Sequence, residues 1–108
     1  MKYGLPERTL EQICTVLAQY PFVERAVLYG SRAKGNYKPG SDIDLPLYGT
    51  GLTSALCATI ADALDDLLLP YGIDLSVFAE LKHPELEAHI QRVGVVFFQR
   101  PPPETTPL

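Results

Sequence analysis

Helical and strand-like hydrophobic patterns alternate along almost the whole of this 108-residue chain. Apolar residues recur at helical spacing in three segments, 9–20, 53–69 and 84–93. Short apolar runs typical of buried strands occupy four others, 23–29, 42–48, 73–78 and 95–99. The alternation predicts an α/β (α+β) fold, in which a small mixed sheet of about four strands is packed with helices.

A chain of this length builds one hydrophobic core, so we expect a single domain over residues 1–100. The remaining segment, 101–108, is proline-rich and predicts an extended, flexible tail, with a partner-binding segment as the alternative.

Two residues mark element boundaries. Thr9 begins a capping-box pattern and predicts the start of the first helix. Pro46 cannot donate a backbone hydrogen bond, so we expect its part of the strand to lie at a sheet edge or at the strand's end.

The formal net charge of −4 argues against a nucleic-acid polymer as a partner, because binding to its backbone relies on Lys and Arg. No apolar stretch is long enough to cross a membrane, and the N-terminal residues have no apolar signal core. We therefore expect a cytoplasmic protein that does not contact a membrane.

Cys14 and Cys57 lack metal-ligand spacing and are interpreted as buried, reduced thiols. His83 and His89 are interpreted as surface or boundary residues.

A glycine-serine turn follows the first predicted strand. Gly30 has no side chain to block the approach of a phosphate, and Ser31 offers its N–H and hydroxyl at the start of a short helix. Arg32 and Lys34 bring positive charge to the same helix. These four are the predicted nucleotide-binding residues. Residues two apart do not share a helix face, so a phosphate role for at least one of Arg32 and Lys34 and a solvated helix surface both remain open.

Three aspartates follow in strand-like runs. Asp42 and Asp44 are two apart on one strand, so their side chains point to the same face, with Cα atoms about 6.5 to 7 Å apart. If the strand that carries Asp74 lies next to theirs, all three carboxylates meet. A magnesium ion would relieve the repulsion between them and suits all-oxygen ligands. The alternatives are solvated aspartates at a strand entrance for the first two and ordinary turn chemistry for Asp74.

The segment GSRAKGNYKPGSDIDL, with Asp74 in YGIDLSVF, resembles the DNA polymerase beta-like nucleotidyltransferase superfamily and its small members, the minimal nucleotidyltransferases. The pattern of that superfamily is Gly-Ser, then Asp-x-Asp on the next strand, then a third acidic residue on a later strand. All five positions are filled here. The resemblance implies a polymerase beta-like core, two Mg²⁺ ions with bound ATP as substrate, and catalytic, metal-binding roles for Asp42, Asp44 and Asp74. In this scheme Asp74 takes the proton of the acceptor hydroxyl.

Minimal nucleotidyltransferases of this kind are similar to the antitoxins of toxin–antitoxin pairs whose partner is a HEPN-domain ribonuclease. The resemblance implies transfer of AMP from ATP to a tyrosine hydroxyl of that toxin, which neutralises it, and an assembly with the partner as a hetero-oligomer. Two alternatives remain. The chain could be a non-catalytic antitoxin that acts by stoichiometric binding, or a nucleotidyltransferase with a small-molecule acceptor.

Overall fold

The computed structural model describes residues 2–101 of the chain. The predicted tail therefore lies outside the described residues from position 102 onward. The helices are α1 (Glu7–Ala18), α2 (Ser31–Lys34), the 3₁₀ turn η1 (Phe78–Glu80), α3 (Ser54–Asp65) and α4 (Pro84–Val93). The strands are β1 (Arg25–Leu28), β2 (Ile43–Tyr48), β3 (Ile73–Val77) and β4 (Val95–Gln99). None of the helices described is long and apolar enough to cross a membrane.

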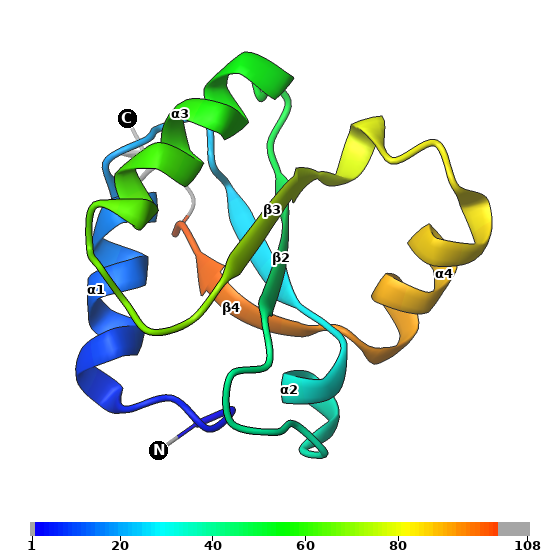
Figure 1. Ribbon diagram of the computed structural model, residues 1–108. Coiled ribbons are helices and arrows are strands. Elements are labelled where there is room, and N and C mark those ends of the chain that lie inside the picture. The colour runs from blue at the N-terminus through cyan, green and yellow to red at the C-terminus, as the bar shows by residue number, and fades with distance from the viewer. Residues whose placement is uncertain (1, 102–108) are drawn as a thin grey trace, which may run out of the picture.

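The four strands form one mixed sheet in the order β3-β2-β1-β4. β2 pairs in parallel with β3, and β1 pairs antiparallel with both β2 and β4. Figure 1 shows α1 and α3 together on one side of the sheet and α4 on the other. The predicted mixed sheet of four strands packed with helices is confirmed.

The core lies between the sheet and the pair α1 and α3. Ile43, Leu45 and Leu47 alternate along β2 and are fully buried in this core. Because successive strand residues point to opposite faces, the residues between them point to the other face of the sheet. The pleat of β2 therefore directs Asp44 away from the core and toward the side of α4.

Pro46 lies in the middle of a central strand, so the prediction of an edge position or a strand end was wrong. The N–H of Ile43 donates to Gly72 O on the β3 side (2.8 Å). Because the N–H groups of successive strand residues point to opposite sides, the N–H that Pro46 lacks would face β1. The β1–β2 pairing has partners at Ala26↔Leu47 and again at the bridge Tyr29↔Asp44, with Pro46 between them. The sheet accommodates proline by omitting one pair on one side of the strand.

Two helix boundaries also differ from the prediction. α1 begins at Glu7 after Pro6, so Thr9 is a buried residue inside the first turns and not the cap. α3 ends at Asp65 rather than continuing to residue 69. Leu68 has a φ of +55° and is 88% exposed, so it belongs to a turn and not to the apolar face of a helix. Local apolar spacing does not reveal this turn, because Leu67 and Leu69 still pack against the core.

The two cysteines are free thiols, as predicted. Cys57 is buried and Cys14 is half-buried, with its thiol directed at Phe97 O (3.7 Å). Burial raises the pKa of both thiols.

Candidate active site

The glycine-serine turn joins β1 to α2 and lies against β2. Gly30 has φ +86° and ψ −156°, a backbone conformation that is essentially restricted to glycine. A Cβ at this position would lie 3.0 Å from Oδ2 of Asp44. The helix that follows is one turn long and closes at Gly35, whose N–H donates to Ser31 O (3.0 Å). The missing side chain at Gly30 therefore brings the turn and the Asp44 carboxylate into direct contact.

We expect Gly30→Ala to lower the free energy of unfolding by about 1–3 kcal/mol, because the new Cβ is strained by the backbone and meets the carboxylate of Asp44. Chemical denaturation measures this change. Gly35→Ala is the matched control: its φ is +87°, but no atom lies within 4 Å of the added Cβ. A loss at Gly30 no larger than the loss at Gly35 would contradict the assigned contact with Asp44.

Two carboxylates lie side by side near this turn, with a third at the edge of the pair. Asp44 and Asp74 are direct partners in the parallel pairing of β2 and β3, so their side chains leave the same face of adjacent strands, which are about 4.8 Å apart. Asp42 is exposed just before β2, and a Cβ on Gly72 would lie 2.5 Å from its Oδ1. Its carboxylate therefore covers the backbone that leads to Asp74. The condition under which Asp74 was expected beside the other aspartates, that its strand lies next to theirs, is met.

The electrostatics of this cluster are unfavourable without a counter-charge. Burial raises the pKa of Asp44 above its usual value, and the negative charges of Asp74 and Asp42 raise it further. Neighbouring carboxylates disfavour one another's ionised form in this way. The cluster therefore attracts either a proton or a cation.

The donors present fit a hard divalent cation. Carboxylate oxygens are the ligands that Mg²⁺ prefers, and at nucleotide sites one or two carboxylates are commonly completed by phosphate oxygens. Within residues 2–101, no three acidic, histidine or cysteine side chains converge into a ready-made metal cage. What the aspartates offer is a partial shell beside the glycine-serine turn.

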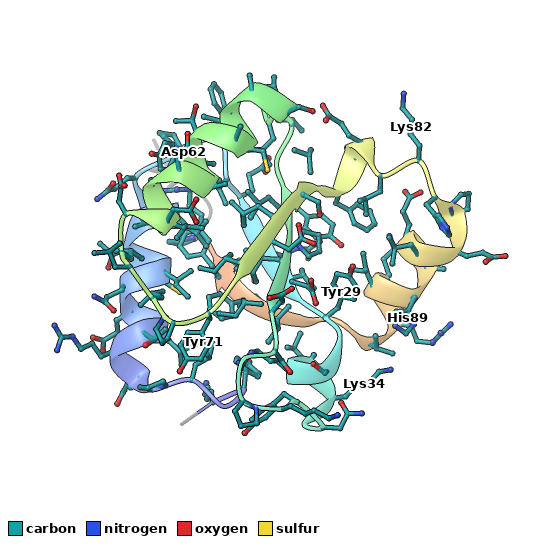
Figure 2. The ribbon with its side chains drawn as sticks, in the orientation of Figure 1. Tyr29, Lys34, Asp62, Tyr71, Lys82 and His89 are labelled. Atoms are coloured by element: carbon teal, nitrogen blue, oxygen red, sulfur yellow. The ribbon has the colours of Figure 1, made fainter. Side chains whose placement is uncertain are left out.

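The two basic residues of α2 lie in different surroundings. Lys34 is exposed at the end of the helix (Figure 2). Arg32 is only 2% exposed, and its guanidinium donates to Ser41 O (2.9 Å) and Tyr3 O (2.8 Å). Lys34 is therefore accessible to a ligand or to solvent, so both alternatives stay open for it, whereas Arg32 does not lie on a solvated helix surface.

Tyr29 and His89 also neighbour the site, although neither was among the predicted site residues. The N–H of Tyr29 donates to Asp44 O (3.3 Å), and burial, then Asp44, then Asp74 raise the pKa of its phenol. His89 of α4 packs edge-on against the Tyr29 ring, with centroids 6.4 Å apart (Figure 2). Strand alternation could have placed Tyr29 on the face of Asp44. No local pattern indicates that α4 returns to this point.

Comparison with known proteins agrees with this architecture. The model of a family described as Polymerase beta, Nucleotidyltransferase matches residues 11–102. One chain in a crystal structure of a toxin–antitoxin with AMP-PNP is similar with a TM-score of 0.70 and 20% identity, over 84% of this chain and 73% of that chain. One chain of the toxin–antitoxin MntA-HepT is similar with a TM-score of 0.65 and 18% identity, over 88% of this chain and 74% of that chain. None of the curated proteins compared matches the chain significantly.

The fold and the family match define the class of protein as a nucleotidyltransferase. The match covers most of the chain and includes the glycine-serine turn and all three aspartates. The chain belongs to the polymerase beta nucleotidyltransferase family. The predicted polymerase beta-like core is confirmed.

Proposed function

We propose that this protein is a Mg²⁺-dependent nucleotidyltransferase that transfers AMP from ATP to a tyrosine hydroxyl of a HEPN ribonuclease toxin and thereby neutralises it. The observation that carries the proposal is the pairing of Asp44 with Asp74 on adjacent parallel strands, with Asp42 and the turn at Gly30 beside them. Carboxylates and a phosphate-accessible turn are the two components that nucleotidyl transfer needs at one place.

Asp74 is the proposed general base. It is exposed on the edge strand β3, where an acceptor from another molecule can reach it. The acceptor oxygen attacks the α-phosphorus of ATP, the bond to pyrophosphate breaks, and Asp74 receives the hydroxyl proton.

Gly30, Ser31 and Lys34 are proposed to bind the phosphates of ATP. The first backbone N–H groups of a helix have no partner within the helix and can donate to phosphate oxygens. Lys34 adds a mobile positive charge from the same helix. Asp42, Asp44 and Asp74 would hold magnesium, which when bound neutralises the charge that the phosphates and carboxylates share.

The choice of nucleotide and acceptor is supported by the similar structures. Both are toxin–antitoxin complexes, and one contains AMP-PNP, an analogue of ATP. A third, of a mutant of such a complex, has two aspartates replaced by glutamate. We place the reaction in the cytoplasm, where ATP is available, and the protein in a hetero-oligomer with its toxin.

Intact-mass analysis of the partner tests the proposal. After incubation of this protein with its cognate toxin, ATP and Mg²⁺, we expect the toxin's mass to increase by one or more AMP units, located on tyrosine by fragmentation. The modified toxin should stay inactive as a ribonuclease after the two proteins are separated. If inhibition disappears on separation and no mass is added, the protein is a stoichiometric inhibitor and the proposal is wrong. If AMP is transferred only to small molecules, the protein is a nucleotidyltransferase but the proposed acceptor, a tyrosine of the toxin, is wrong.

A further inference from the structure

We propose that Arg32 is a positioning residue that holds together the two chain segments carrying the acidic cluster, and that it does not itself bind phosphate. It lies directly after Ser31 yet is almost fully buried. Its Nε donates to Ser41 O and its Nη1 to Tyr3 O. The segment that ends at Ser41, the residue before Asp42, and the N-terminal segment at Tyr3 are thus hydrogen-bonded to one guanidinium.

The faces of the guanidinium are also in contact. Its carbon lies 5.3 Å from the centroid of the Tyr37 ring and 5.0 Å from that of Tyr71. Both distances are within the range of a cation–π interaction. Tyr71 belongs to the approach to β3, as its place in Figure 2 shows. Arg32 therefore also contacts the segment that leads to Asp74.

These segments meet at one point. Ile43 N–H donates to Gly72 O (2.8 Å), and the carboxylate of Asp42 lies where a side chain on Gly72 would be. A small displacement of either segment would change the separation of Asp42 and Asp74. Arg32 donates a hydrogen bond to Ser41, the residue before Asp42. It also contacts the ring of Tyr71, three positions before Asp74.

The chemistry of arginine explains why this residue type suits the position. Guanidinium remains charged when buried, and its planar fork can donate in two directions while its faces stack on aromatic rings. A lysine ammonium has no such plane. Burying a charge is costly unless it is hydrogen-bonded, and here both described hydrogen bonds go to carbonyl oxygens. Two of its five N–H donors are therefore used by the protein's own backbone, and its 2% exposure leaves little of the guanidinium accessible to a ligand.

Hydrogen exchange of the protein without nucleotide tests the positioning role independently of any activity. Arg32→Met should increase amide exchange in residues 36–43 and 70–74 while leaving β4 unchanged. Arg8→Met, which removes an exposed arginine of α1, is the matched control and should change neither segment. Unchanged exchange in 36–43 and 70–74, or an equal rise throughout the chain, would overturn the proposal.

A kinetic measurement separates positioning from phosphate binding, and this arm rests on the proposed AMP transfer. Arg32→Met should lower kcat about a hundredfold, as small misplacements of reacting groups can do, with little change in KM for ATP. Lys34→Met should instead raise KM for ATP. A raised KM with normal kcat in Arg32→Met would make Arg32 a phosphate ligand.

A conservative variant distinguishes the fork from the charge. Arg32→Lys keeps the charge and should show both the increased exchange and the low kcat. If Arg32→Lys has the amide exchange and the kcat of the wild-type protein, the proposed role of the two hydrogen bonds from Arg32 to carbonyl oxygens is wrong. If the wild-type protein transfers no AMP, the proposed function fails, but the exchange measurement still decides the role of Arg32.

Discussion

Asp44→Asn is expected to lower AMP transfer by about a hundredfold to a thousandfold, the range seen when one group that stabilises transition-state charge is removed. The substitution removes a proposed magnesium ligand at the centre of the cluster, next to both Asp74 and the turn at Gly30. We expect ATP and Mg²⁺ together to raise the melting temperature of the wild-type protein, and Asp44→Asn should abolish this rise. Initial rates and thermal melting measure the two effects.

The same variant should be more stable than the wild-type protein when nucleotide and metal are absent. The folded-state pKa of Asp44 is raised by burial and by two neighbouring negative charges. A raised carboxyl pKa contributes stability that is present below the ordinary aspartate pKa and is lost as pH rises through the folded value. The advantage of Asp44→Asn should therefore be full at neutral pH and vanish in acid, as melting curves across pH would record.

Asp62→Asn is the matched control for this substitution. Asp62 is an exposed aspartate on α3, on the other side of the sheet from the cluster (Figure 2). It should leave transfer and the response to ATP and Mg²⁺ unchanged. Normal transfer by Asp44→Asn would refute its place in the active site, and a normal melting response would refute its role as a metal ligand.

Asp74→Asn is expected to slow AMP transfer by about a hundredfold to ten-thousandfold, the usual contribution of a positioned general base. Because Asp74 is exposed and the change preserves its shape, binding of the toxin should remain. A binding assay and intact-mass analysis of the toxin, run side by side, measure the two properties. Binding and chemistry would then be separated in one variant.

The outcome also decides between catalysis and simple inhibition. With Asp74→Asn, toxin should regain ribonuclease activity once the two proteins are separated, because little AMP has been attached. If this variant neutralises the toxin as lastingly as the wild-type protein without any added mass, a covalent mark is not the cause of neutralisation. The acidic cluster would then need another explanation.

Much of the fold and of the candidate site could be predicted from local sequence. The strand β4 and the helix α4 begin and end where apolar periodicity, Pro84 and Gly94 place them. The convergence of Asp44 and Asp74 follows from strand alternation once their strands are assumed to be neighbours. Each of these inferences uses only the short-range geometry of helices and strands.

What could not be predicted depends on contacts between distant segments. Pro46 is tolerated in a central strand only because its missing N–H faces β1, which is a matter of register. Arg32 is buried because Tyr3, Ser41 and Tyr71 close around it, and none of these is its neighbour in sequence. His89 reaches Tyr29 only through the path of the chain after β3. Such positions are set by the tertiary arrangement.

The parallel pairing of β2 and β3 has a consequence for how the protein folds. The two strands are joined through α3, so their contact closes a long loop, whereas β1 and β2 are closer along the chain. Contacts between distant residues carry a larger entropy cost and tend to slow folding. We therefore expect β3 to dock after β1 and β2 have paired, and the carboxylates of Asp44 and Asp74 to repel one another during that step. Divalent cations in the refolding buffer should accelerate this step, since they offset the repulsion as the strands meet.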